Sequence, residues 1–147
     1  MSKIAKASAS KKHNVKNFVY ISSSMVYGDF TNDVTEDYDC KPQGQYGIMK
    51  LAGEHLVKDY SRRNCFSYTI IRPSAVYGPL DVEDRVIAKF MLTAMRGGVL
   101  NVNGADETLD FTYVDDLVNG VKLLTDCIPK NNEKISDHDS LSPVAPF

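Results

Sequence analysis

The sequence has 147 residues, of which 43% are hydrophobic and 24% charged, proportions typical of a globular protein and not of a fibrous or disordered one. Its 17 basic and 19 acidic side chains give a net charge of -2, so we expect neither nucleic acid nor an anionic membrane as a partner. No apolar run approaches the roughly 18–20 residues of a membrane helix, and the Lys- and Ser-rich N-terminus does not resemble a secretory signal.

The three cysteines and three histidines are scattered along the chain, and no CxxC pair occurs. This spacing predicts neither a disulfide framework nor a metal site. Reduced thiols are typical of the cytoplasm, where we expect the protein to be located.

The first half of the chain predicts a strand, a long loop, a helix and a second strand, at residues 17–23, 28–44, 45–63 and 66–71. Both strands are almost continuously apolar, as are strands buried on both faces of a parallel sheet. Within the helix, the apolar stripe is expected to include Ile48, Leu51, Ala52 and Leu56.

The second half predicts a turn at Gly78-Pro79, a helix over 84–95, and two short strands over 99–102 and 111–114. A last helix is expected to end at Leu124, and the Asn-, Asp- and Ser-rich tail over 129–147 is expected to be poorly ordered. The alternation of strands and helices predicts an α/β fold with a parallel sheet.

One pair of residues suggests chemistry. Tyr46 and Lys50 lie four positions apart in the predicted helix, so their side chains are expected on the same face. An ammonium group nearby favours the ionised phenolate and makes a tyrosine a usable general base. Ser22, Ser23 and Ser24 lie at the carboxyl end of the first strand, the edge of a parallel sheet where ligands bind.

Four motifs occur in order along residues 11–124: Val-Tyr-Ile-Ser-Ser-Ser-Met-Val-Tyr-Gly at 19–28, Tyr-xxx-Lys at 46–50, Ile-Arg-Pro-Ser-Ala-Val-Tyr-Gly-Pro at 71–79, and Asp-Phe-Thr-Tyr-Val-Asp-Asp at 110–116. Together they resemble the extended short-chain dehydrogenase/reductase family, in its nucleotide-sugar epimerase/dehydratase branch. The resemblance implies a Rossmann-like fold, NAD as cofactor (with NADP as an alternative) and a nucleotide sugar as substrate.

The resemblance also implies roles for individual residues. Ser23 matches the catalytic serine or threonine, Tyr46 the general base, and Lys50 the lysine that binds the nicotinamide ribose. The cofactor-binding residues implied are Ile21, Ser22, Tyr46, Lys50, Pro73 and Val76. The substrate-binding residues implied are Ser23, Ser24, Met25, Ala75 and Arg85, where Arg85 is a candidate anion partner.

Four positions depart from the pattern of this branch. Ser24 and Met25 stand where its dehydratases have an Asp-Glu pair, which favours epimerase or reductase chemistry over elimination of water. Leu109 stands in place of an arginine that contacts the diphosphate, and Ala75 in place of an asparagine. These two changes would suit a reductase that acts on a carbonyl compound other than a nucleotide sugar.

The Gly-rich turn that binds the cofactor phosphates has no counterpart, since neither G-x-G-x-x-G nor G-x-x-G-x-x-G occurs. We therefore expect a partial Rossmann-like parallel sheet with helices on both faces, truncated at its N-terminal Gly-rich βα unit and in its C-terminal substrate lobe. Residues 1–128 would form this partial NAD-dependent epimerase/dehydratase domain.

Two functions of different classes follow. The first is a sugar-nucleotide 4-epimerase that transfers a hydride transiently to NAD. A reductase of the same superfamily is the alternative within this class. In either case, the segment alone would be inactive if it lacks the phosphate site. The second is a non-catalytic fragment or interaction subunit. The resemblance further implies a homodimer that pairs through the helix of Tyr46, where Ile48, Leu56 and Tyr60 are candidate contacts.

Overall fold

The computed structural model describes residues 15–29, 34–64, 66–82, 84–104, 108–127 and 144–145. The chain divides into two compact units. The first unit comprises residues 1–73 and 126–147, and the second comprises residues 74–125. The predicted boundary at residue 128 is not tested by this division, and each unit is described here by itself.

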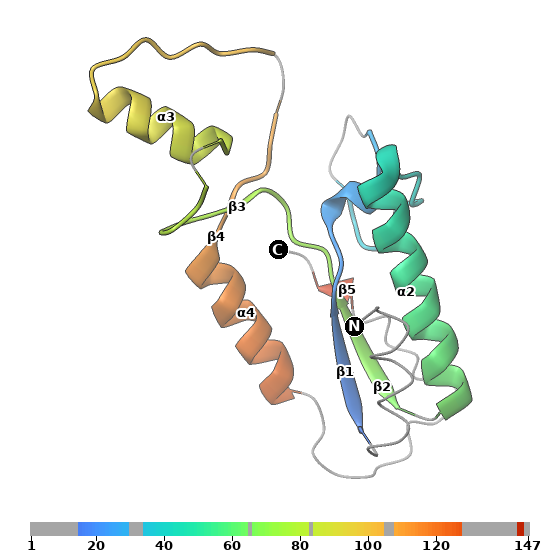
Figure 1. The fold of residues 1–147 in the computed structure, drawn as a ribbon. Helices are drawn as coiled ribbons and strands as arrows, with labels where there is room; N and C mark the ends of the chain where they lie inside the picture. The colour runs from blue at the N-terminus through green and yellow to red at the C-terminus, as the bar shows by residue number, and fades with distance from the viewer. Residues whose placement is uncertain are drawn as a thin grey trace. The chain divides into compact units, whose positions relative to one another are not determined.

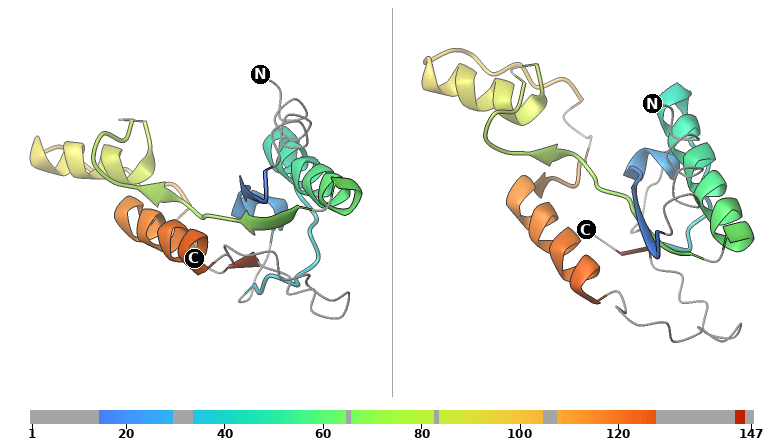
Figure 2. Two further views of the ribbon diagram at one scale, coloured as in Figure 1. Left: turned by 90° about the horizontal axis from the view of Figure 1, so that it is seen from below. Right: turned by 60° about the horizontal axis from the view of Figure 1, so that its bottom comes forward.

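The first unit is built on a parallel sheet with the strand order β1-β2-β5, formed by β1 (Asn17–Ile21), β2 (Ser67–Ile71) and β5 (Val144–Ala145). Helix α2 (Gly44–Asn64) joins β1 to β2 and lies along this strand pair (Figure 1, Figure 2). Parallel neighbours need such a crossover, because the chain must return to the same end of the sheet. The predicted strand–helix–strand order and its parallel pairing are confirmed.

The core of the first unit lies between α2 and the sheet. Tyr20 from β1, Val57 from α2 and Ile70 from β2 form its buried cluster. The ring of Tyr20 reaches α2 at Gly53, where a Cβ atom would clash with the tyrosine hydroxyl. A glycine at this position therefore allows the helix and the strand to pack closely.

The apolar stripe predicted for α2 does not face the sheet. The side chains of Ile48 and Leu56 are 53% and 36% exposed, whereas Gly53, Glu54 and Val57 are buried. A glycine and a charged residue occupy the face of α2 that meets the sheet. The positions of the apolar residues therefore identify the exposed face of this helix and not its buried face.

A short 3-10 helix, η1 (Ser24–Val26), follows β1 and was not expected from the sequence. The loop predicted over 28–44 contains no helix or strand at residues 28–29 and 34–43, and its last residue, Gly44, begins α2. Of the tail predicted to be poorly ordered, only 144–145 are described, as β5; the remainder lies outside the described residues.

The second unit contains β3 (Val76–Tyr77) and β4 (Thr112–Tyr113), which pair in parallel, together with α3 (Val86–Met95) and most of α4 (Val114–Cys127). The strand predicted over 99–102 is absent: these residues are exposed and in neither a helix nor a strand. The partner of β4 is instead β3, a two-residue strand too short to leave a periodic signal. No helix in the described part of the chain is long and apolar enough to cross a membrane.

Candidate functional site

The serine segment, residues 22–25, is held against the end of β2 by its backbone. The amide of Ser22 donates to the carbonyl oxygen of Ile71 at 2.6 Å, and the amide of Ser24 donates to that of Pro73 at 3.1 Å. These two bonds continue the β1–β2 pairing beyond the strands. They also bring Pro73, one of the expected cofactor-binding residues, next to the serine segment.

Ser23 begins η1 as its N-cap. Its backbone is extended, with φ at -167° and ψ at 151°, and its Oγ accepts a hydrogen bond of 3.2 Å from the amide of Met25. This is the usual role of a serine at a helix start, where amides lack helical partners. The cap holds the Ser23 side chain, which is 8% exposed, in one direction.

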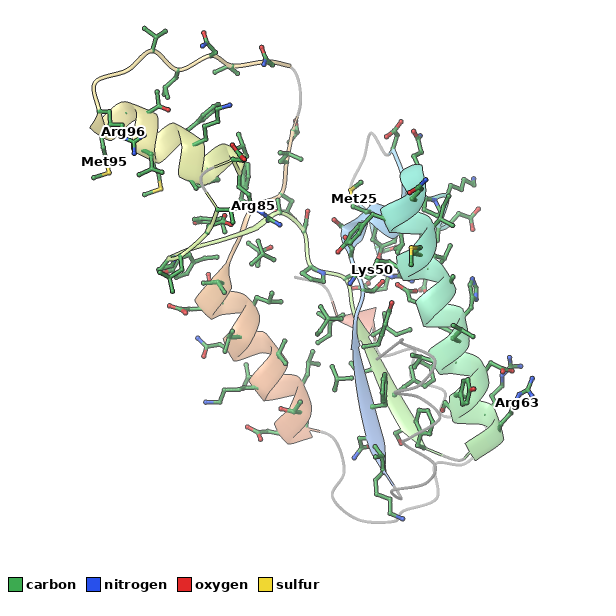
Figure 3. All side chains as sticks on the ribbon, in the orientation of Figure 1. Met25, Lys50, Arg63, Arg85, Met95 and Arg96 are labelled. Atoms are coloured by element: carbon green, nitrogen blue, oxygen red, sulfur yellow. The ribbon has the colours of Figure 1, made fainter. Side chains whose placement is uncertain are left out.

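Tyr46 and Lys50 lie in the first two turns of α2, as their spacing predicts. The Lys50 Nζ atom donates to the carbonyl oxygen of Ile21 at 2.8 Å and lies 5.4 Å from the centre of the Tyr46 ring. Figure 3 shows Lys50 directed from α2 toward the end of β1. The ring of Tyr46 remains accessible, with 58% of the residue exposed.

A glycine connects the serine segment to the helix of Tyr46. Gly47 is buried, and a Cβ atom there would clash with the carbonyl oxygen of Met25 and lie 3.0 Å from the Cβ of Pro42. The chain at Met25 thus packs directly on the first turn of α2. The structure therefore brings the serine segment together with Tyr46 and Lys50 at one end of the sheet.

This end of the sheet has the donor groups expected for the nicotinamide ribose of a dinucleotide. An ammonium carries three N–H donors, and the bond to Ile21 leaves two on Lys50 for ribose hydroxyls. The buried Ser22 hydroxyl oxygen has no hydrogen-bond partner among the described residues, an arrangement that is rare in native proteins. The residues present fit this portion of the cofactor.

A buried ion pair next to the serine segment was missed by the sequence reasoning. The Arg72 guanidinium donates from Nε and Nη2 to the Glu54 carboxylate at 3.0 and 2.7 Å. Burial lowers the pKa of Arg72, but the hydrogen bonds to Glu54 and Tyr27 outweigh it and raise this pKa above its ordinary value. The sequence signal for this ion pair was a charged residue at the end of an apolar strand, because a charged side chain is buried only when it has a partner.

The phenol of Tyr27 shares this environment. Tyr27 is 8% exposed and accepts a hydrogen bond of 2.9 Å from Arg72 Nη1. Burial raises the pKa of Tyr27 more than the neighbouring guanidinium lowers it. The phenol therefore stays protonated at neutral pH.

The remaining expected site residues, Ala75, Val76 and Arg85, belong to the second unit. Arg85 Nη1 donates to the carbonyl oxygen of Val76 at 3.1 Å, and Arg85 Nε lies 3.5 Å from Asp81 Oδ1. Figure 3 shows Arg85 beside β3. A substrate anion at Arg85 would therefore compete with the carboxylate of Asp81.

These residues line a pocket of about 180 Å³ within the second unit. Leu109 lines the same pocket together with Ala75. Ala75 has a φ of 32°, a left-handed conformation that is strained for a residue with a Cβ atom. The other oxygen of Asp81, Oδ2, is buried and has no hydrogen-bond partner within the described part of the chain.

Comparison with known proteins identifies relatives of the chain. The profile of the NAD dependent epimerase/dehydratase family matches residues 4–134. An uncharacterized UDP-glucose epimerase of Bacillus subtilis is 32% identical over 114 residues, which are 77% of this chain and 36% of that protein. A human dTDP-D-glucose 4,6-dehydratase is 31% identical over 113 residues, 76% of this chain and 32% of that protein.

A solved structure extends the similarity to the fold. The UDP-glucuronic acid 4-epimerase of Bacillus cereus, crystallised with NAD, matches with a TM-score of 0.79 and 30% identity. The match covers 88% of this chain and 42% of that protein. The chain thus spans about a third to two fifths of the length of these relatives.

Proposed function

Because this chain belongs to the NAD dependent epimerase/dehydratase family, whose members are enzymes, we propose that it carries the catalytic residues of a nucleotide-sugar 4-epimerase. The observation that carries this proposal is the convergence of the Ser23 segment, Tyr46 and Lys50 at one end of the sheet. The relatives of known structure are named as enzymes that bind nucleotide sugars and NAD.

Tyr46 is the proposed general base. Its exposed ring lies near the ammonium of Lys50, and its phenolate form is the proposed base. The phenolate takes the proton from the sugar 4-hydroxyl and, as phenol, returns a proton to the oxygen when the hydroxyl forms again.

Ser23 and Lys50 position the reactants. Ser23 donates a hydrogen bond to the sugar oxygen, while Lys50 binds the ribose hydroxyls of the cofactor with its two remaining donors. When bound, NAD supplies the hydride acceptor that allows the carbon at this position to become a ketone and then regain its hydrogen. Ser24 and Met25 offer neither an acid nor a base for eliminating water, which favours epimerisation over dehydration.

The test is Tyr46→Phe in the protein expressed from its full reading frame. We expect turnover of UDP-sugars to fall by about 10²- to 10⁴-fold, the usual contribution of a positioned base. NAD affinity, measured by titration calorimetry, is expected to change little, because Phe retains the ring. Met49→Ala, at an exposed position of the same helix, is the matched control, and retained turnover in Tyr46→Phe would refute the proposed base.

A reductase of the same superfamily is the second candidate, favoured by the pocket of the second unit. Leu109 and Ala75 line it in place of the family's arginine and asparagine, and an apolar side chain cannot bind a diphosphate. UDP binding distinguishes the two candidates. Saturable UDP binding that Leu109→Arg leaves intact supports the epimerase, whereas binding that appears only in Leu109→Arg supports the reductase.

Two further properties belong to the proposal. The exposed side chains of Ile48 and Leu56 on α2 are apolar, which supports a homodimer that pairs through this helix.

Cys40 and Cys127 are free thiols, which supports a cytoplasmic location, where thiols stay reduced. Cell fractionation checks this location.

A further inference from the structure

Arg72 joins three separate segments of the first unit. The residue is 7% exposed and sits directly after β2. Its Nε and Nη2 atoms bind the carboxylate of Glu54 on α2, and its Nη1 atom donates to the Tyr27 hydroxyl at 2.9 Å. The same Nη1 atom donates to the carbonyl oxygen of Glu36, in the loop before α2, at 3.1 Å.

Two of these contacts lead to proposed catalytic residues. Glu54 lies one helical turn beyond Lys50 on α2. Tyr27 closes η1, the short helix that begins at Ser23. The carbonyls on either side of Arg72, those of Ile71 and Pro73, accept hydrogen bonds from the serine segment. One guanidinium thus links the segment of Ser23 to the helix of Tyr46 and Lys50.

We propose that Arg72, together with Glu54 and Tyr27, is a positioning network that sets the separation between Ser23 and Tyr46. The inference rests on the proposed function, because it assigns the network a role in that reaction. A planar guanidinium presents its donors in fixed directions, which an ammonium group cannot do. A displacement of about 1 Å between reacting groups can cost about 10²-fold in rate, so a rigid link has a direct consequence for turnover.

Stability alone does not account for the choice of residues. A buried ion pair is often no more stabilising than well-packed apolar residues of the same volume. Arg72 instead donates hydrogen bonds to acceptors in three segments, and its most distant partner, Tyr27, lies 45 residues away in the sequence. The ring of Tyr27 also lies against the guanidinium, 4.8 Å from its central carbon, which fixes the orientation of both groups.

Tyr27→Phe tests the network in the protein expressed from its full reading frame. The variant keeps the aromatic ring and the Arg72–Glu54 pair, and removes only the oxygen that Nη1 binds. Tyr38→Phe is the matched control, because the Tyr38 ring meets that of Tyr27 edge-on at 6.2 Å and the residue is 41% exposed. Arg72→Lys is the second variant, since it retains the charge opposite Glu54 but not the fixed donor directions.

We expect Tyr27→Phe and Arg72→Lys to lower kcat by about tenfold while KM changes by less than about twofold, because positioning and not ground-state binding is lost. Amide hydrogen exchange of residues 22–27 is expected to accelerate in both variants and to stay unchanged in Tyr38→Phe. A melting temperature of Tyr27→Phe close to that of the control would separate positioning from general loss of stability.

Unchanged exchange of residues 22–27 in folded Tyr27→Phe and Arg72→Lys overturns the proposal, as does accelerated exchange with unchanged kcat. If the wild-type protein turns over no nucleotide sugar, the proposed function fails. In that case the exchange of residues 22–27 alone decides whether Arg72 positions the serine segment.

Discussion

At the scale of single residues, the main feature of this protein is that the charged side chains of Arg72 and Glu54 are buried. Their side chains are 5% and 1% exposed, and each would be costly to bury alone. In contrast, Asp59 lies near Arg63 at 3.0 Å with both side chains partly exposed, where water screens the attraction and the pair contributes little. These two ion pairs should therefore respond very differently to the loss of a carboxylate.

We predict that Glu54→Gln lowers the free energy of unfolding by about 3–5 kcal/mol, because it leaves the guanidinium of Arg72 buried without a counter-charge. Since the pKa of Arg72 is raised, its stabilising contribution is fully present below the ordinary arginine pKa and is lost only above it. The effect of Glu54→Gln should therefore be the same at pH 6 and pH 9. Urea unfolding followed by circular dichroism measures it.

Asp59→Asn is the control for this comparison, with an expected change of about 0–1 kcal/mol. A similar loss of stability in both variants would contradict the distinction between the buried and the exposed pair.

Packing of secondary-structure elements depends on the glycines of α2. Gly47 receives the backbone at Met25, and Gly53 receives the ring of Tyr20. Neither contact can be read from helix propensity, by which glycine is simply unfavourable in a helix. These glycines instead let η1 and β1 approach the helix that carries Tyr46 and Lys50.

We predict that Gly47→Ala destabilises the protein by about 1–3 kcal/mol, because the added methyl group overpacks the contact with Met25. By propensity alone the same substitution would stabilise a helix by about 1 kcal/mol, so the sign of the change decides the cause. The thermal midpoint measures it, with the exposed Met49→Ala variant as the control for changes in α2. A stabilised Gly47→Ala protein would show that the backbone at Met25 moves away at little cost.

At the scale of the whole molecule, the expected site residues are divided between the two units. The serine segment, Tyr46 and Lys50 lie in the first unit, whereas Ala75, Val76 and Arg85 lie in the second. The chain also covers only 36% of the Bacillus subtilis relative and 42% of the Bacillus cereus enzyme. The activity and assembly proposed here therefore concern the complete protein.

We predict that the protein sediments as a dimer and that Ile48→Glu shifts it to a monomer, because a carboxylate would be desolvated in an α2–α2 contact. Analytical ultracentrifugation checks this outcome. Val99→Glu, at an 82% exposed position of the second unit, is the control and should remain dimeric. A monomeric wild type would refute pairing through α2.

Local patterns predicted much of this protein. The apolar runs of β1 and β2, the helix between them and the parallel α/β class are all confirmed, because continuous apolarity and helix signals act over a few neighbouring residues. The four motifs also identified the family, which the profile over residues 4–134 confirms.

Tertiary structure alone decided which side of α2 faces the sheet, that β3 and not residues 99–102 pairs with β4, and that Arg72 is buried against Glu54. In each case the deciding contact joins residues distant in sequence: Gly53 with Tyr20, Val76 with Thr112, and Arg72 with Tyr27. A local pattern records the preference of a segment for water or for a backbone conformation. It does not record which partner compensates a buried charge or fills the space beside a glycine.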